Sequence, residues 1–396
     1  MLHVDLERYN SGSSRLLVTR VRSKTLKVAI GTMGRFHVLD LARELSAFGH
    51  EVDFYSFVPR KMALRFGLPK RCHRGVLPVL APLVAWGRFA PTFQSRLREQ
   101  ATAYALNAAV IARMRPCDVF ICMSGMYLEA AAYARERFGA QVWLERGSRH
   151  ILSQNEILKR VGAAGASSFM TDRELKGYDL ADRIVLPSSH ARDSFLEVSS
   201  TFSGKLFVNS YGVDLTQFPV VAKVSGERPV RLLTVGTWGK QKGSDLLEEL
   251  VLQREDYTLT HVGGIGDLPF PEAERFTHID SVPQTELTRY YAEADIYVQA
   301  SRQEGLAVVQ VQALASGLPL ACSYNSGGAD LMHDHGLRER VQVFEVESIE
   351  SMEKAIETLA LTLPKLKPPS ESSRQSLTWS AYGKRYEREL LKHLAS

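Results

Sequence analysis

Glu304 is the residue of this chain that is best placed to do chemistry. An apolar run at 295–299 predicts a buried strand just before it, and apolar residues at helical spacing over 306–315 predict a helix just after it. Ligands of open α/β sheets bind at the carboxyl ends of the strands, which is where this order places Glu304. Gln312 follows eight residues later, about two helical turns on, so it can lie on the same side as Glu304.

A lysine-rich loop, Gly236–Gly243, is the second candidate site. It lies between a predicted strand at 230–235 and a helix that begins at Ser244, and it carries Lys240 and Lys242. Ammonium groups and the free amides at a helix start both stabilise anions. A loop of this composition is often only solvated surface, but its place between a strand and a helix favours anion binding.

Paired glycines mark two further turns. Gly327 and Gly328 open a predicted short helix, whose backbone amides we expect to face a diphosphate. In the first half of the chain, Gly31 and Gly34 follow a predicted strand at 26–30. Their spacing is G-x-x-G rather than G-x-G-x-x-G, so an NAD-dependent oxidoreductase is poorly supported. The small residues still let an anion or a substrate approach the backbone.

Polar residues also follow the strand predicted at 141–144. Glu145, Arg146, Arg149 and His150 come directly after it, at the end of the strand where ligands bind. Two interpretations stay open for these residues. They are either acceptor-side or catalytic groups, or a polar turn that caps the next helix.

The composition predicts a soluble protein of two domains. The chain has 396 residues, of which 45% are apolar and 23% charged. Residues 1–24 are polar and basic without an apolar segment, so we expect a loosely ordered arm rather than a secretory signal. No uninterrupted apolar run reaches the roughly 18 residues that predict a membrane-spanning helix. Four scattered cysteines without paired spacing favour a reducing cytoplasm.

Charge is distributed unevenly along the chain. Residues 1–212 carry 30 Lys and Arg against 18 Asp and Glu, a net charge of +12, whereas residues 213–396 carry 19 against 26, a net charge of −7. Residues 56–98 contain no acidic residue, and basic residues there alternate with apolar ones. This mixture suits an anionic membrane surface or a lipid-linked acceptor, but a solvated basic helix beside a core segment explains it equally well. No nucleic-acid-binding motif accompanies the charge, so we expect no nucleic-acid partner.

In the order of these segments, the chain resembles the retaining glycosyltransferases of the GT-B fold, in the group often called family four (glycosyl transferases group 1). The resemblance covers about residues 26–392. It is strongest in five segments: Tyr178–Ser189, Tyr211–Asp214, Val235–Gly243, Ala292–Ser301 and Glu304–Pro319. It implies an α/β protein with two Rossmann-like, doubly wound domains that face each other across a cleft.

The resemblance also assigns a role to each part of the chain. After the basic arm at 1–24, residues 25–218 would form the acceptor-binding domain and residues 219–378 the nucleotide-sugar-binding domain. Residues 379–396 would form a C-terminal helix that packs back on the N-terminal domain. The basic half of the chain is then the acceptor half, which fits the charge distribution.

The family's donor site contains a Glu, seven residues and a second Glu. Glu304 matches the first, which contacts the hydroxyls of the donor sugar, and Gln312 stands at the second, which holds the ribose. A glutamine there would bind the ribose through neutral hydrogen bonds. Lys242 matches the family's diphosphate lysine, but Thr237 replaces its arginine, so Lys240 is the nearest spare cation.

The resemblance extends the candidate sites by several positions. Further donor-binding candidates are Gly236, Gly305, Gly327, Gly328 and Val282. Acceptor-binding candidates are Gly31, Gly34, Arg35 and Arg149. The candidate catalytic residues are Glu304, Glu145, Arg146 and His150.

The implied reaction moves a hexose, with retention, from a UDP- or GDP-linked sugar to a saccharide or lipid-linked saccharide in surface polysaccharide or lipopolysaccharide synthesis. Lysines and amides would neutralise the departing diphosphate, so we expect neither a metal nor another cofactor. Two alternatives stay open: a nucleotide-sugar epimerase on the same fold, and a non-catalytic GT-B protein that binds nucleotide sugars. The expected location is the cytoplasm, with the inner face of the cell membrane as a candidate site of peripheral attachment.

Overall fold

The computed structural model describes residues 25–77, 95–221, 229–334 and 336–394. The predicted basic arm therefore lies outside the described residues, as does much of the acid-free stretch, at 78–94. Within the parts that are described, no helix combines the length and the apolar character that crossing a membrane requires.

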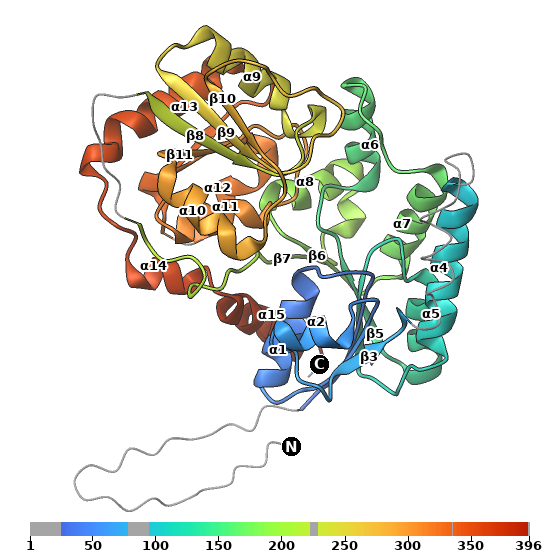
Figure 1. Ribbon diagram of the computed structural model, residues 1–396. Coiled ribbons are helices and arrows are strands. Elements are labelled where there is room, and N and C mark those ends of the chain that lie inside the picture. The colour runs from blue at the N-terminus through green and yellow to red at the C-terminus, as the bar shows by residue number, and fades with distance from the viewer. Residues whose placement is uncertain (1–24, 78–94, 222–228, 335, 395–396) are drawn as a thin grey trace, which may run out of the picture.

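Two parallel sheets form the centre of the molecule (Figure 1). The first has seven strands in the order β3-β2-β1-β4-β5-β6-β7. Its strands are β1 (Lys27–Thr32), β2 (Glu51–Ser56), β3 (His73–Gly75), β4 (Val119–Met123), β5 (Gln141–Glu145), β6 (Arg183–Leu186) and β7 (Leu206–Val208). Its helices are α1 (His37–Ala47), α2 (Arg60–Arg65), α4 (Ser95–Ile111), α5 (Leu128–Phe138), α6 (Ile151–Arg160), α7 (Ser168–Leu180) and α8 (Ser189–Val198).

The second sheet has six strands in the order β10-β9-β8-β11-β12-β13. Its strands are β8 (Val230–Val235), β9 (Tyr257–Val262), β10 (Phe276–Ile279), β11 (Ile296–Gln299), β12 (Leu320–Ser323) and β13 (Val341–Phe344). The helices of this half are α9 (Ser244–Gln253), α10 (Leu287–Glu293), α11 (Val308–Ala315), α12 (Gly328–Asp334), α13 (Ile349–Thr362), α14 (Glu371–Ser376) and α15 (Trp379–Leu394).

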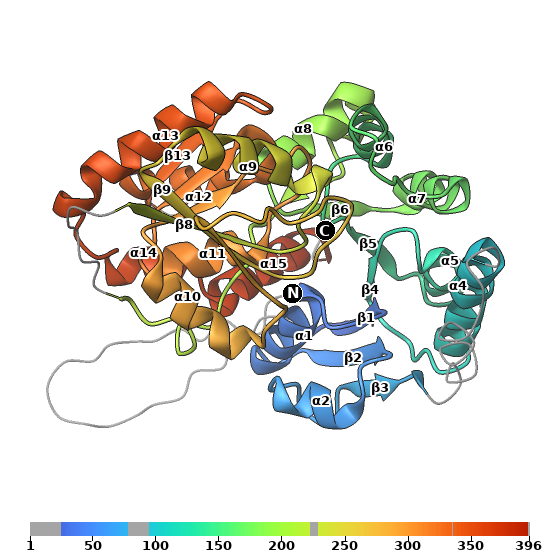
Figure 2. The same cartoon turned by 45° about the horizontal axis from the view of Figure 1, so that its top comes forward.

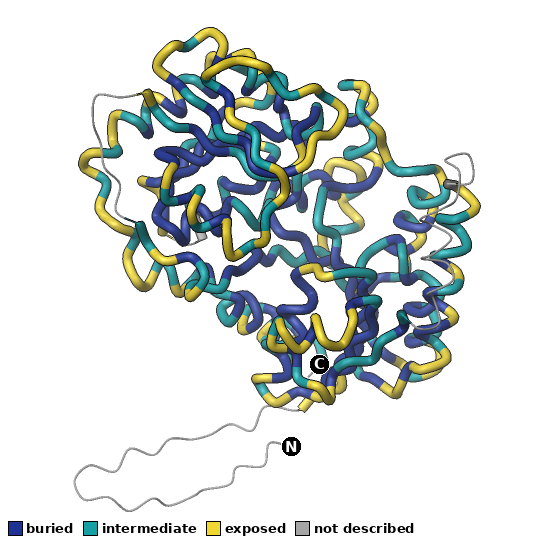
Figure 3. The backbone as a smooth tube through the Cα atoms, in the orientation of Figure 1, coloured by how far each residue is buried: buried dark blue, intermediate teal, exposed yellow. Residues whose placement is uncertain are grey.

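The central strands are buried on both faces because helices cover both sides of each sheet (Figures 2 and 3). In the first sheet Val28 of β1 is in register with Val52 of β2 on one side and with Val119 of β4 on the other. In the second sheet Leu232 of β8 is in register with Leu259 of β9 and Ile296 of β11. Continuous apolar runs form these strands, which is why the sequence predicts them.

The last helix, α15, returns to the first sheet, as predicted. It packs against α1, and a Cβ on Gly383 would lie 2.6 Å from Cβ of Glu44 in α1. The buried side of α15 includes Tyr382, Tyr386 and Leu390. The chain forms the C-terminal domain from β8 to α14 before α15 returns to the N-terminal domain. This last helix therefore connects the two domains (Figure 1).

Candidate functional site

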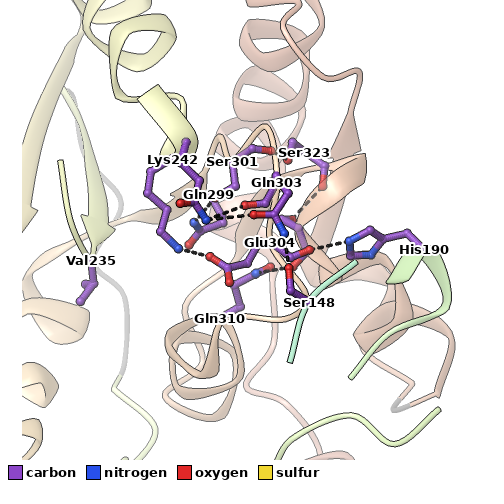
Figure 4. A network of polar contacts seen from close by, with 12 residues as sticks. Ser148, His190, Val235, Lys242, Gln299, Ser301, Gln303, Glu304, Gln310 and Ser323 are labelled. Atoms are coloured by element: carbon purple, nitrogen blue, oxygen red, sulfur yellow. Dashed lines mark hydrogen bonds and ion pairs between the residues drawn. The ribbon is translucent and has the colours of Figure 1, made fainter. Parts of the chain in front are cut away.

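Lys242 and Glu304 meet where the two predicted loops converge, at the carboxyl ends of β8 and β11. The Lys242 ammonium donates a hydrogen bond to Oε2 of Glu304 (Figure 4). The two side chains are 27% and 17% exposed, so the pair is partly accessible to solvent rather than enclosed in the core. Residues that lie 62 positions apart in sequence thus form one site.

Burial lowers the pKa of the Lys242 ammonium to about 8. A small cavity lies beside the ammonium, lined in part by Gly236 and Thr237 of the same loop. The arrangement therefore presents a cation, a carboxylate and backbone of the glycine-rich loop at one place.

The turn that carries Glu304 is rigidly held from within the C-terminal domain. The Glu304 amide donates to the backbone oxygen of Asn325 at 3.0 Å, and the Asn325 side chain donates to the backbone oxygen of Arg302. Below the turn, the buried side chain of Gln299 donates to Ser301 at 2.6 Å. Ser323 donates to the backbone oxygen of Ser301 at 2.5 Å (Figure 4).

Arg302 anchors the lysine loop to the same turn. Its guanidinium donates to both carboxylate oxygens of Asp245 at 2.6 and 2.8 Å, and to the backbone oxygen of Lys240 at 2.7 Å. A further bond runs to Glu347 at 2.8 Å. The buried guanidinium therefore links the loop, the start of α9 and Glu347, and its pKa is raised by the hydrogen bonds to Asp245.

The other cation of the loop points elsewhere. A Cβ built on Gly162, at the end of α6 in the N-terminal domain, would lie 3.5 Å from the Lys240 ammonium. Thr237, where the family has an arginine, is exposed. The structure thus brings Lys242, but not Lys240, next to Glu304, so Lys240 is poorly placed to replace the missing arginine.

Gln312 is buried on α11, and its side-chain oxygen accepts a hydrogen bond of 3.0 Å from the hydroxyl of Tyr291. Val282, which precedes α10, is only partly buried. The side-chain oxygen of Gln312, which would accept from a ribose hydroxyl, thus already accepts a hydrogen bond from the protein. Ribose binding by Gln312 stays a prediction, and the groups left for it are the amide NH2 group and the second lone pair of the oxygen.

The glycines near Glu304 have packing reasons to be glycine. A Cβ on Gly305 would lie 2.0 Å from the backbone oxygen of Gly147, and one on Gly327 would lie 2.2 Å from the backbone oxygen of Gly305. Gly327 also has a φ of 79°, which favours glycine. A Cβ on Gly328 would meet the side chains of Cys322 and Gln310 at 2.5 Å. Close approach to the Gly147 backbone of the N-terminal domain accounts for Gly305, and close approach to the Gly305 backbone together with the positive φ accounts for Gly327.

The candidate catalytic residues at the end of β5 bond within the N-terminal domain. Glu145 is buried and bonds to His37 at 2.8 Å and to the hydroxyl of Tyr386 at 2.7 Å, so it fastens α1 and α15 to the sheet. Arg146 is also enclosed and contacts Glu174 at 3.3 Å. A catalytic role for these two residues stays a prediction, and the structure shows that their polar atoms bond inside the N-terminal domain.

His150 likewise caps a helix. Its Nδ1 accepts from the amide of Leu152 at 3.3 Å, and the ring packs against Tyr178 and Phe195. Burial lowers the pKa of His150 to about 4, so the imidazole is neutral. The capping role that the sequence left open is therefore present in the structure, and a catalytic role for His150 stays a prediction.

Of the predicted acceptor-side residues, two reach the other domain. Arg149 donates to the side-chain oxygen of Asn325 at 3.1 Å, and Arg35 donates to Gln284 at 2.9 Å. Gly31 packs closely beneath Tyr127 inside the N-terminal domain, with a built Cβ at 3.0 Å. Gly34 has more space, with the nearest side chain, that of Phe36, at 3.5 Å from a built Cβ.

Sequence reasoning missed a set of residues that join the domains at Glu304. Gln303 donates to the hydroxyl of Ser148, and Ser188 and His190 bond to the backbone of the Glu304 turn. The segment that contains Ser188 is one of those that resemble the family, but the resemblance alone gave it no role. Among the described residues, no group of three or more His, Cys, Asp or Glu side chains is arranged to hold a metal ion.

The C-terminal half of this chain matches a known family. Residues 203–361 match the model described as Glycosyl transferases group 1. The resemblance to glycosyl transferases group 1 is confirmed for these residues, whereas the retaining character stays a prediction. A curated relative, the amylovoran biosynthesis glycosyltransferase AmsK of Erwinia amylovora, is 26% identical over 270 residues, which are 60% of this chain and 61% of AmsK. The chain spans less than two thirds of the lengths of the curated relatives that it matches.

Solved structures share the fold over nearly the whole chain. Sucrose-phosphate synthase from Thermosynechococcus elongatus superposes with a TM-score of 0.66 at 16% identity, covering 93% of this chain and 99% of the synthase. HepE from Anabaena, in complex with UDP and glucose, superposes with a TM-score of 0.62 at 13% identity, covering 92% and 99%. The predicted GT-B fold, with two parallel α/β domains, is therefore confirmed.

Proposed function

We propose that this protein is a retaining glycosyltransferase that moves a hexose from a nucleoside diphosphate sugar to a saccharide or lipid-linked saccharide. The observation that carries the proposal is the contact between Lys242 and Glu304 at the carboxyl ends of β8 and β11. A diphosphate needs a cation, and sugar hydroxyls need an acceptor such as a carboxylate. The family match over residues 203–361 includes both residues.

In this proposal the leaving diphosphate takes the place of Glu304 beside Lys242. As the anomeric carbon–oxygen bond breaks, its electron pair goes to the β-phosphate oxygen, where the ammonium stabilises the growing negative charge. Glu304 is released to accept hydrogen bonds from the sugar hydroxyls while the ring acquires oxocarbenium character. The acceptor oxygen forms the new bond on the same face, and its proton goes to the departing phosphate.

UDP or GDP is the proposed nucleotide of the donor, and a surface polysaccharide or lipopolysaccharide precursor is the proposed acceptor. The UDP and glucose in HepE and the amylovoran pathway named for AmsK support this choice of substrate classes.

We also propose that α2 attaches the protein to an anionic membrane surface. Its exposed residues are Arg60, Lys61, Met62, Leu64 and Arg65. Basic and apolar side chains on one exposed helix suit lipid headgroups and the acyl boundary. A variant with Arg60, Lys61, Lys70 and Arg71 reversed to Glu should sediment less with phosphatidylglycerol vesicles. Equal sedimentation of this variant, of wild type and of the control Lys354→Glu would contradict the attachment.

The transferase proposal is tested by single-turnover release of nucleoside diphosphate from a panel of UDP- and GDP-sugars, with saccharide acceptors. Wild type should release the nucleotide faster in the presence of an acceptor, and Glu304→Ala should abolish this release while the protein still folds. Normal turnover by Glu304→Ala would refute the donor-site assignment. Tight binding of nucleotide sugars without transfer to any acceptor would instead favour the non-catalytic alternative.

A further inference from the structure

Two residues of the N-terminal domain hold the turn that carries Glu304. Nε2 of His190 lies 2.6 Å from the backbone oxygen of Glu304, and Oγ of Ser188 lies 2.7 Å from the backbone oxygen of Gly305. The two side chains also contact each other, with 2.9 Å between Nδ1 of His190 and Oγ of Ser188. Figure 4 shows the imidazole directed at the turn. Both side chains are buried, at 6% and 0% exposure.

The hydrogen atoms of this contact can be assigned. A carbonyl oxygen only accepts, so Nε2 of His190 carries a hydrogen and donates it to Glu304. Burial, followed by the positive charge of Arg149, lowers the pKa of His190 to about 3, although Asp193 acts in the opposite direction. The imidazole is therefore neutral, and its Nδ1 and the Gly305 oxygen compete for the one hydroxyl hydrogen of Ser188.

Both backbone polar groups of Glu304 are committed, each to a different domain. Its amide donates to Asn325 in the C-terminal domain, and its oxygen accepts from His190 in the N-terminal domain. Gly305 approaches Gly147 so closely that a Cβ would not fit. The direction of the Glu304 side chain therefore depends on how the N-terminal domain docks on this turn, and not only on the domain that contains it.

We infer that His190 and Ser188 are positioning residues for Glu304, through which the acceptor-side domain aligns the carboxylate that contacts the donor sugar. The inference rests on the proposed function, because it assigns the sugar contact to Glu304. In the open form of the cleft the turn would lose two hydrogen bonds, and the sugar would be held less well. Donor alignment is in this way coupled to closure of the two domains.

Substitutions at His190 separate positioning from other roles. His190→Ala removes the donor, whereas His190→Gln keeps an N–H group on a side chain of suitable length. The readout is the ratio of affinities for a UDP-sugar and for UDP, because Glu304 contacts only the sugar. His190→Ala should reduce this ratio by roughly five- to tenfold, the effect of one hydrogen bond, with UDP affinity unchanged. His190→Gln should restore most of the loss.

A double-mutant comparison tests whether His190 acts through Glu304. In a Glu304→Ala background, His190→Ala should change the affinity ratio by less than about twofold, because the carboxylate that it aligns is gone. His73→Ala is the matched control, since His73 also bonds a backbone oxygen, that of Val58 at 2.9 Å, but lies on β3. This control should leave the ratio at the wild-type value.

Amide hydrogen exchange tests the contact between His190 and the Glu304 turn in the absence of any bound sugar. Exchange at residues 303–306 should accelerate in His190→Ala and return toward wild type in His190→Gln. Unchanged exchange, or an unchanged affinity ratio in His190→Ala, would overturn the inference. If wild type binds no nucleotide sugar at all, the proposed function fails. Accelerated exchange in His190→Ala and its recovery in His190→Gln would then still support the contact with the turn, but alignment of a sugar-binding carboxylate would be refuted.

Discussion

Lys242→Ala is the substitution for which the structure gives the clearest magnitude. In the free protein the ammonium bonds to Glu304, and in the proposed reaction it bonds to the diphosphate instead. At about 3 Å and an effective dielectric constant of about 20, a unit charge pair is worth about 5 kcal/mol. Part of this is offset because the contact with Glu304 is lost. The net contribution we expect is about 3 kcal/mol, or about a hundredfold in kcat/KM.

Protein stability should change much less. The pair is partly exposed, and exposed ion pairs contribute only about 0.2–1 kcal/mol to folding. Lys242→Ala should therefore melt within a few degrees of wild type. Affinity for the nucleoside diphosphate, measured by calorimetry, should fall together with kcat/KM, because the ammonium contacts the diphosphate in the ground state as well.

Lys240→Ala is the informative comparison, because it removes the same charge from the same loop. Its ammonium lies beside Gly162 rather than beside Glu304, so the loss in kcat/KM should be below about tenfold. Lys354→Ala, an exposed lysine of α13, should have no effect. The reasoning is refuted if Lys240→Ala loses as much activity as Lys242→Ala, or if Lys242→Ala keeps normal turnover.

Three other outcomes follow from the same contacts. Because burial lowers the pKa of Lys242 to about 8, its positive charge is present below that pH and lost above it. We therefore expect kcat/KM to fall as the pH rises through 8, and Lys242→Arg should remove this decline. Gly305→Ala should force the domains apart at Gly147 and lose most activity. The control Gly204→Ala, which has open space around a built Cβ, should behave as wild type. Equal activity of the two variants would contradict the tight contact at Gly305. Glu145→Ala should lower the melting temperature by several degrees because it leaves His37 and Tyr386 without their partner. If this variant melts as wild type but is inactive, the result would favour a catalytic role for Glu145.

The order of the elements was predictable because the central strands are apolar and the turns contain glycine or proline. Three edge strands, β3, β10 and β13, were not predicted, since each has only three or four residues and none is a continuous apolar run. The helix after Glu304 begins at Val308 rather than at Leu306. These differences are small, and they leave Glu304 at the carboxyl end of β11.

The sequence could not predict the contacts of the polar residues at the end of β5, for a physical reason. Glu145 has partners 108 and 241 residues away, and a local pattern cannot show that such remote side chains satisfy it. A polar run at a strand end therefore has the same sequence pattern whether its side chains face a ligand or the core. Ser188 and His190 were missed for the same reason, because their partners lie in the other domain.

The central claim is that Lys242 and Glu304 form the binding site of a nucleoside diphosphate sugar. Calorimetric titration of wild type, Lys242→Ala and Glu304→Ala with UDP, GDP and their sugars tests it most directly. The account predicts that wild type binds one of these nucleotides and that Lys242→Ala weakens binding of the nucleotide itself. Glu304→Ala should remove the extra affinity for the sugar without weakening binding of the nucleotide. Binding of every nucleotide with equal affinity by all three proteins, or by none of them, would contradict it.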